Sequence, residues 1–274
     1  MLKIKYLAIA FSIIFIIFIV LIGAFPPLIL GPALFASIRN ITVPVSIVLI
    51  LGMTFSFVLF LLNYRLLSLL EREDWPALAY YLEQKVFKKN QCSGRNVRLL
   101  ASSYLVMTDF SSVLNLESKV MTANPSAIEK NILIFGTARI LNGNYKDAAC
   151  FFKANFGKDI PKQDQWVRWF YGFCQMLVGA FTEAEGELSS LVISSPDAIV
   201  TGLSAYFLET CLARHSMDAA GCRAASEKGR QRVVGALKGI ENWKREQMKM
   251  GTEIYISIIK KYIDEAGSWL YSPK

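Results

Sequence analysis

The hydrophobic positions divide the chain into an apolar first quarter and a polar remainder. Residues 6–38 carry no charged side chain, and the same is true of residues 40–64. A helix that spans a membrane needs about 20 mainly apolar residues, so this pattern predicts two spans, at residues 6–24 and 43–62. Three prolines and a glycine within residues 25–42 interrupt helical hydrogen bonding between the spans. We therefore expect a transmembrane helical hairpin.

A cleaved signal peptide is the competing interpretation of the N-terminus. Lys3 and Lys5 would form its positive region. However, the apolar run is about twice as long as the roughly 7–15 residues that such peptides use. No small-x-small cleavage site precedes Pro26. We therefore expect the hairpin to remain attached to the chain.

Basic residues near the spans predict the orientation. The connecting segment offers only Arg39, whereas more bases flank the outer ends of the two spans: Lys3, Lys5, Arg65, Arg72, Lys85, Lys88 and Lys89. Bases accumulate on the cytoplasmic side of membranes. The bias predicts an inner-membrane or plasma-membrane protein with both termini, and the remainder of the chain, in the cytoplasm. A periplasmic remainder is the alternative.

The polar remainder contains a repeat. Four aromatic residues, each preceded by a polar or glycine-containing turn, are spaced by 35, 35 and 36 residues: Trp75, Phe110, Tyr145 and Phe181. Upstream of the last three, a large apolar residue is followed by a small one, in the pairs Leu100-Ala101, Phe135-Gly136 and Tyr171-Gly172. A small residue lets two helices pack closely, so each unit is expected to be a pair of helices. Prolines that stop helices recur near the unit ends, at Pro125, Pro161 and Pro196.

This pattern resembles the tetratricopeptide repeat (TPR), a helix–turn–helix unit of about 34 residues, over residues 59–196. The resemblance implies an all-α fold, in which two transmembrane helices precede a TPR-like α-solenoid of about four helical hairpins with C-terminal capping helices. Arg139 and Gln175 depart from the family, because a bulky apolar residue is usual at those positions. A generic stack of helical hairpins is the alternative interpretation.

The expected domains are therefore a transmembrane hairpin, residues 1–64, and a repeat domain, residues 65–274. We expect the second span to continue out of the bilayer as the first helix of the repeat domain. Beyond Pro196 the period fades, and the apolar pattern predicts three further helices, at residues 198–214, 217–232 and 241–263.

Composition supports this division. All 22 acids lie in residues 71–274, and charged residues make up 19% of the chain, against about 25% in an average soluble domain. These features exclude a wholly soluble protein, a disordered chain and a polytopic transporter.

The resemblance also implies a concave surface lined by the first helix of each unit. Residues three and four apart share one helix face. The expected lining changes from basic to aromatic along the chain: Arg95, Arg98 and Lys130, then Trp166, Trp169, Phe173 and Met176. Such a surface suits a peptide with acidic and apolar parts. The alternative is that the aromatic residues belong to the core, where aromatics at helical spacing are more often found.

The remaining chemistry of the sequence is sparse. Residues 223–249 hold eight bases and three acids, which favours a solvated helix face, with contact to anionic lipid as the alternative. The five cysteines include no C-x-x-C pair and His215 is the only histidine, so we expect buried free thiols and no metal or cofactor. No nucleotide-binding or hydrolase motif occurs, so neither an enzyme nor a nucleic-acid partner is expected.

Together these features favour a membrane-anchored scaffold that recruits a protein partner, or holds one in a multiprotein membrane assembly. The expected partners are a protein, bound through the concave face, and the lipid bilayer. One alternative is a periplasmic structural component of a secretion or motility complex. Another is an accessory or catalytic subunit of a membrane-bound enzyme.

Overall fold

The computed structural model describes residues 2–157, 161–251 and 253–272; among these, the side chains of residues 2–8, 11, 19–20, 22–42 and 161–162 are not described. The described residues form helices joined by short turns, without a strand, as expected for an all-α fold. By internal contacts the chain divides into two compact units, Met1–Tyr81 and Leu82–Lys274.

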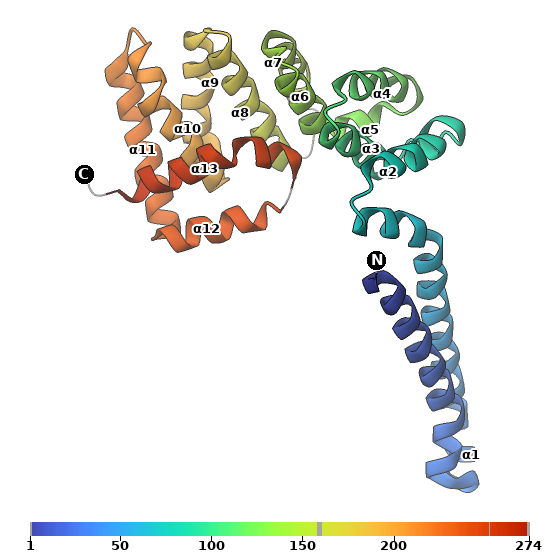
Figure 1. The fold of residues 1–274 in the computed structure, drawn as a ribbon. Coiled ribbons are helices and arrows are strands. Elements are labelled where there is room, and N and C mark those ends of the chain that lie inside the picture. The colour runs from blue at the N-terminus through green and yellow to red at the C-terminus, as the bar shows by residue number, and fades with distance from the viewer. Residues whose placement is uncertain (1, 158–160, 252, 273–274) are drawn as a thin grey trace. The chain divides into compact units, whose positions relative to one another are not determined.

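The first unit consists of α1 (Leu2–Glu71) and most of α2 (Trp75–Glu83). The rings of Phe15 and Phe57 stack with their centroids 5.5 Å apart. In a straight α-helix the residues between them would span about 63 Å, so the chain must reverse direction between the two rings. Figure 1 shows the two helical arms side by side. The prolines expected to make the turn lie among the side chains that are not described.

The second arm of α1 has the length and composition of a membrane span. Its Val43–Glu71 segment is long and apolar enough to cross a bilayer. Large apolar side chains along it are exposed, with Val48 and Leu62 each at 67%. Among the described residues it is the one segment that meets this test. The other expected span, residues 6–24, is helical, but several of its side chains are not described.

The first unit extends further than residues 1–64. Helix α1 continues to Glu71, and a turn at Glu73, with φ of 52°, leads into α2. The guanidinium carbon of Arg65, near the end of α1, lies 5.1 Å from the centre of the Tyr81 ring on α2. Because α2 returns to the end of α1, the contacts divide the chain after Tyr81.

The second unit contains four successive helix pairs: α3 (Gly94–Val106) with α4 (Phe110–Ala123), α6 (Ile132–Leu141) with α7 (Tyr145–Ala154), α8 (Pro161–Leu177) with α9 (Phe181–Ser194), and α10 (Ala198–Thr210) with α11 (Ala219–Leu237). Three short elements accompany these pairs. The π-helix η1 (Gln84–Lys88) precedes the first pair, α5 (Pro125–Glu129) lies between the first and second, and the 3₁₀ helix η2 (Leu212–Arg214) connects α10 to α11. Helices α7 and α8, and α9 and α10, also pack together, so each pair contacts the next.

Each of the four repeated aromatic residues opens a helix. Helices α2, α4, α7 and α9 begin at the four aromatic residues. Two residues before each aromatic, the backbone adopts a positive φ, at Glu73, Thr108, Gly143 and Gly179. The next N–H then bonds back to a carbonyl of the preceding helix, as Ala180 does to Gln175 at 2.9 Å. Together with the bond from the Gly179 N–H to the carbonyl of Met176 at 3.1 Å, it forms the Schellman motif that ends a helix. The same pair of bonds recurs at all four turns.

The small residues lie where the two helices of a unit touch. A Cβ atom on Gly136 of α6 would overlap the ring of Phe152 on α7, and one on Gly172 of α8 would lie 3.0 Å from Leu188 on α9. The expected close contacts at Gly136 and Gly172 are confirmed.

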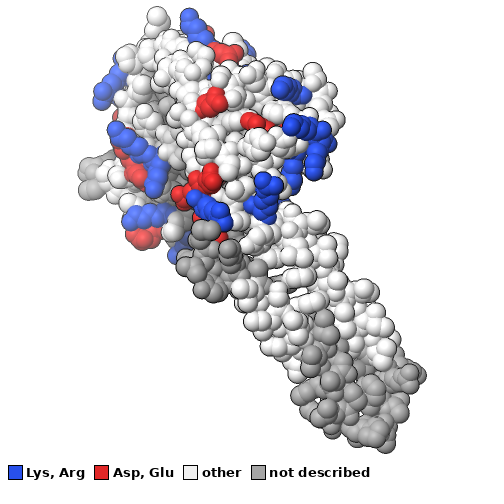
Figure 2. Space-filling view, turned by 45° about the vertical axis from the view of Figure 1, so that its right-hand side comes forward, with Lys and Arg blue, Asp and Glu red and all other residues white. Residues whose placement is uncertain are grey.

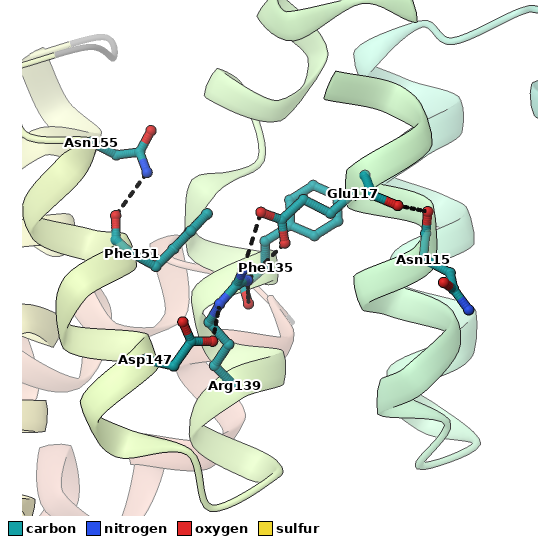
Figure 3. A network of polar contacts seen from close by, with 8 residues as sticks. Asn115, Glu117, Phe135, Arg139, Asp147, Phe151 and Asn155 are labelled. Carbon is teal, nitrogen blue, oxygen red and sulfur yellow. Dashed lines mark hydrogen bonds and ion pairs between the residues drawn. The ribbon is translucent and has the colours of Figure 1, made fainter. Parts of the chain in front are cut away.

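Arg139, which departs from the TPR pattern, joins three helices. Its guanidinium donates to both carboxylate oxygens of Glu117 on α4, at 2.7 and 3.1 Å, and to Asp147 on α7 at 2.8 Å. The guanidinium carbon of Arg139 also lies 4.2 Å from the centre of the Phe151 ring. The side chains of Arg139 and Glu117 are only 11% and 12% exposed. A charged pair with two hydrogen bonds thus lies between the helices, at a position where TPR proteins usually have an apolar residue (Figure 3).

The C-terminal helices differ from the expectation. The single helix predicted over residues 241–263 is wrong, because α12 (Ile240–Lys249) and α13 (Ile254–Tyr271) are separate helices. Gly251 lies between them with φ of 71°, a conformation that favours glycine and ends a helix. The helix predicted over 198–214 is α10 followed by η2, and the one predicted over 217–232 is the longer α11.

Candidate functional site

The face formed by the first helices of the pairs, where partner binding is expected, is occupied by α13. Figure 1 shows α13 running across α8 and α10. Helix α13 also contacts α6 and α11. Among its aromatic contacts with α8 and α10 are three ring pairs with centroids 5.8–6.4 Å apart: Tyr255 with Trp166, Tyr262 with Phe173, and Trp269 with Tyr206.

One side of α13 is fully apolar and buried. The residues on this side are at most 5% exposed and recur at spacings of three and four: Ile256, Ile259, Ile263, Ala266 and Leu270. The opposite side carries Lys260 and Asp264, which are exposed. Burying one such isoleucine stabilises a fold by about 1.5–3 kcal/mol. Helix α13 is therefore part of the core of this unit.

The predicted aromatic lining lies beneath or beside α13. Trp169 is 0% exposed, and its ring stacks on Phe173 at 5.3 Å and meets Phe207 at 5.9 Å. Its indole N–H has no hydrogen-bond partner among the described residues. The Trp166 N–H donates to Asp197 at 3.2 Å. Trp166, Phe173 and Met176 are at most 8% exposed. The structure thus places these side chains in the core, the alternative kept open by the sequence.

Polar contacts fasten α13 along its length. Arg98 on α3 forms an ion pair with Glu253, just before α13. The Tyr206 hydroxyl donates to Glu265 at 3.0 Å, and burial, then this hydrogen bond, raises the pKa of Tyr206. At the far end, Arg230 Nε donates to the carbonyl of Leu270 at 3.0 Å. Arg98, one of the predicted partner contacts, is therefore engaged within the chain.

Trp243 on α12 is the buried residue that the sequence analysis missed. It is 1% exposed and donates its N–H to the carbonyl of Ile263 at 3.2 Å. A Cβ on either Gly202 of α10 or Gly267 of α13 would come within 2.6 Å of its ring. In the sequence, these two glycines inside apolar helices could have indicated that a large side chain packs against them.

The remaining predicted residues, Arg95 and Lys130, are exposed. Asn131 Nδ2 donates to the carbonyl of Gly94 at 3.0 Å, which holds the segment before α6 against the start of α3. This bond brings together the backbone neighbours of Arg95 and Lys130. We call these two residues the basic rim.

Much of the positive charge in residues 223–249 serves the fold. Arg232 donates to the carbonyls of Val192, at 2.8 Å, and Ser195, at 2.6 Å, near the end of α9. Such contacts satisfy carbonyls that a helix end leaves unpaired. Lys244 and Lys249 each pair with a glutamate three residues earlier.

The cysteines are free thiols, as expected, but they are not all buried. Cys92, Cys174 and Cys222 are buried, Cys211 is half-buried and Cys150 is exposed. Burial raises the pKa of Cys174 to about 12. Among the described residues, no group of three or more His, Cys, Asp or Glu side chains is arranged to hold a metal ion.

Comparison with known proteins places this domain in a family. A family model described as "Uncharacterised Treponema protein" matches residues 112–272, more than half of the chain. The chain is also similar to an "Uncharacterized protein" of Treponema pallidum (strain Nichols), with 29% identity over 222 residues, 78% of this chain and 70% of that protein. No solved structure matches significantly. The matched region includes α13 and the helices against which it packs.

Proposed function

The chain belongs to this family of uncharacterised Treponema proteins, and we propose that it is a membrane-anchored scaffold. In this proposal, the first unit fixes the chain in a membrane. The domain of helical hairpins then recruits a protein partner, or holds one in a multiprotein assembly.

The exposed apolar surface of α1 carries this proposal. Along Val43–Glu71, Leu51, Phe55 and Leu62 are each more than 60% exposed. A soluble monomer rarely exposes so large a continuous apolar surface, whereas a bilayer covers it. The stacked pair Phe15 and Phe57 supports a hairpin in which both arms span the membrane.

A disulfide cross-link tests the two-span arrangement. With Phe15→Cys and Phe57→Cys in one chain whose native cysteines are replaced by serine, mild oxidation in membranes should form an intramolecular bridge. The control pair, Phe15→Cys and Leu62→Cys, lies more than one helical turn out of register and should bridge poorly. Equal cross-linking of both pairs, or none, would contradict a packed hairpin.

A TPR-like solenoid is the arrangement that we propose for the hairpins. The support is the recurrence of one turn geometry two residues before each repeated aromatic. Close approach of the helices at Gly136 and Gly172 adds to it. Stacked helical hairpins of this kind commonly bind peptides and proteins on an extended face.

The basic rim is the part of the first-helix face that we propose for partner binding. Helix α13 already covers the aromatic part, and Arg98 is paired with Glu253. Arg95 and Lys130 remain exposed, so an acidic segment of a partner is the complementary ligand. Exposed charges of this kind chiefly set the rate of association and its dependence on salt.

Purification of the full chain in mild detergent, followed by mass spectrometry, tests this function. A protein that co-purifies with the wild-type chain should be reduced about tenfold or more by the double change Arg95→Glu and Lys130→Glu. The control is Lys260→Glu, which alters an exposed base on the outer side of α13. Loss of the partner with the control alone, or no dependence on the rim, would reject the proposed surface.

We propose that the domain faces the cytoplasm, on the strength of the flanking bases. Cys150 is an exposed native thiol on α7 and therefore a direct probe. A membrane-impermeant maleimide should leave it unlabelled in cells whose outer barrier is opened, and should label it only after the inner membrane is lysed. Labelling before lysis would place the domain in the periplasm.

A further inference from the structure

A second group of bases, separate from the basic rim, lies at the start of the second unit. Lys88 ends the π-helix η1 and Lys89 follows it; both are exposed. Lys119 on α4 places its ammonium nitrogen 4.2 Å from the centre of the Phe87 ring on η1. This contact places a third exposed base against the residue that precedes Lys88. Figure 2 shows Lys and Arg side chains at both sides of the visible face.

The three ammonium groups are available to a partner. Within the part of the chain that the structure describes, neither Lys88, Lys89 nor Lys119 forms an ion pair with a carboxylate. Unpaired like charges on the same part of a surface repel one another. A surface that carries negative charge would relieve this repulsion.

A polar pocket adjoins these bases. It has a volume of about 530 Å³ and lies between the loop after Lys89 and the end of α4, one turn beyond Lys119. Carboxamides form much of its lining, from Asn90, Gln91, Asn96 and Asn124. The Asn124 amide donates to the carbonyl of Cys92 at 2.8 Å and so ties the two walls together. Neutral amides of this kind hydrogen-bond hydroxyl groups and phosphate oxygens.

We infer that Lys88, Lys89, Lys119 and this pocket form a surface that docks on anionic phospholipid headgroups. The inference rests on the proposed membrane anchorage. Sixteen residues separate Lys88 from Glu71, the end of the segment that could span a membrane. Nine of them form α2, which is about 14 Å long. The chain therefore tethers these bases close to the bilayer, where anionic headgroups attract them.

Residues 223–249, the other basic stretch, fit this role less well. Arg230 and Arg232 bond backbone carbonyls, and Lys244 and Lys249 pair with glutamates. These groups are already engaged within the chain. The lipid contact considered for that stretch is therefore assigned to η1 and α4 instead.

Lysine footprinting of the full chain in nanodiscs tests this surface. Two compositions are compared: phosphatidylcholine alone, and phosphatidylcholine with phosphatidylglycerol. An amine-reactive reagent and mass spectrometry report the labelling of each lysine. Lys88, Lys89 and Lys119 should label several-fold more slowly in the anionic discs, and the difference should vanish in high salt. Lys228 and Lys260, exposed elsewhere, should label equally in both.

Binding to vesicles measures the size of the preference for anionic lipid. Each base near an anionic surface adds about fivefold to the binding constant. Changing the three lysines to glutamate should therefore remove a preference for phosphatidylglycerol of about 100-fold. The matched control reverses three bases of the other stretch: Lys228→Glu, Lys238→Glu and Lys244→Glu. It should keep the preference.

The outcomes separate the two proposals. If the chain inserts in nanodiscs but its three lysines label equally in both compositions, the docking surface is overturned while the anchorage stands. Protection of Lys228 instead would move lipid contact to the other stretch and also overturn it. If the chain fails to insert, the anchorage fails. Sedimentation with vesicles of the two compositions then still tests the docking surface. The surface is supported only if the wild-type chain prefers vesicles with phosphatidylglycerol and the triple lysine variant does not.

Discussion

Truncation of Trp169 to alanine distinguishes a core residue from a partner contact. The ring is fully buried and packs against Phe170, Phe173 and Phe207. Removing such a side chain leaves a cavity that the neighbours fill only in part. The free energy of unfolding of the second unit should therefore fall by about 3–5 kcal/mol. For a domain of this size the melting temperature should fall by roughly 6–20 °C.

Circular dichroism of the full chain in mild detergent measures this effect. Trp169→Phe is the matched control: it keeps an aromatic ring and deletes an indole N–H that has no hydrogen-bond partner among the described residues. It should lose much less stability than Trp169→Ala. If Trp169→Ala melts within about 2 °C of the wild type while partner capture is lost, Trp169 is a binding residue and the packing described above is wrong.

Further predictions concern packing, charge and thiol reactivity. Gly136→Ala should destabilise the domain by about 1–3 kcal/mol, because the added methyl group overlaps a ring. Gly186 is also helical but has open space around it, so Gly186→Ala should stabilise the domain. Equal melting temperatures of the two variants would count against the assigned contact. Arg139→Met should lower the free energy of unfolding in chemical denaturation by about 3 kcal/mol, since it leaves the largely buried carboxylate of Glu117 unpaired. Adding Glu117→Met should restore most of that loss. Maleimide at neutral pH should modify Cys150 rapidly and Cys174 only on unfolding, because burial raises the pKa of Cys174 to about 12; similar rates in the native chain would contradict this burial.

The repeated hairpins could be predicted because their signals are local. An αL turn followed by an aromatic requires only a few neighbouring residues, and it recurs at Gly143 and Tyr145 and at Gly179 and Phe181. A small residue opposite a large one encodes the approach of adjacent helices, as at Gly136. Each signal is completed within one unit, and the repeated aromatics coincide with the starts of α2, α4, α7 and α9.

The position of α13 could not be predicted in the same way. Its isoleucines show that one side is buried, but an apolar stripe does not specify which helices cover it. The contacts of Tyr255 with Trp166 and of Tyr262 with Phe173 join residues about ninety positions apart in the sequence. No periodicity links them. At the level of sequence, the aromatic residues of α8 therefore fit either an open binding face or a covered core.

Arg139 illustrates a second limit. In the sequence it is a departure from an apolar position, which weakens the resemblance to TPR proteins. In the structure it binds Glu117 with two hydrogen bonds and stacks on Phe151. The partner lies on another unit, so the compensation becomes visible only when the helices are packed.

Site-specific photo-cross-linking in cells tests the central claim, that the membrane-anchored domain binds a protein through its basic rim. A photoreactive amino acid replaces Arg95 or Lys130 in the full chain, and Lys260 is the control position on the outer side of α13. The account predicts that both rim positions cross-link to the same protein in the membrane fraction, and that position 260 does not. Cross-linking of that protein at position 260 alone, or no protein product at either rim position, would contradict it.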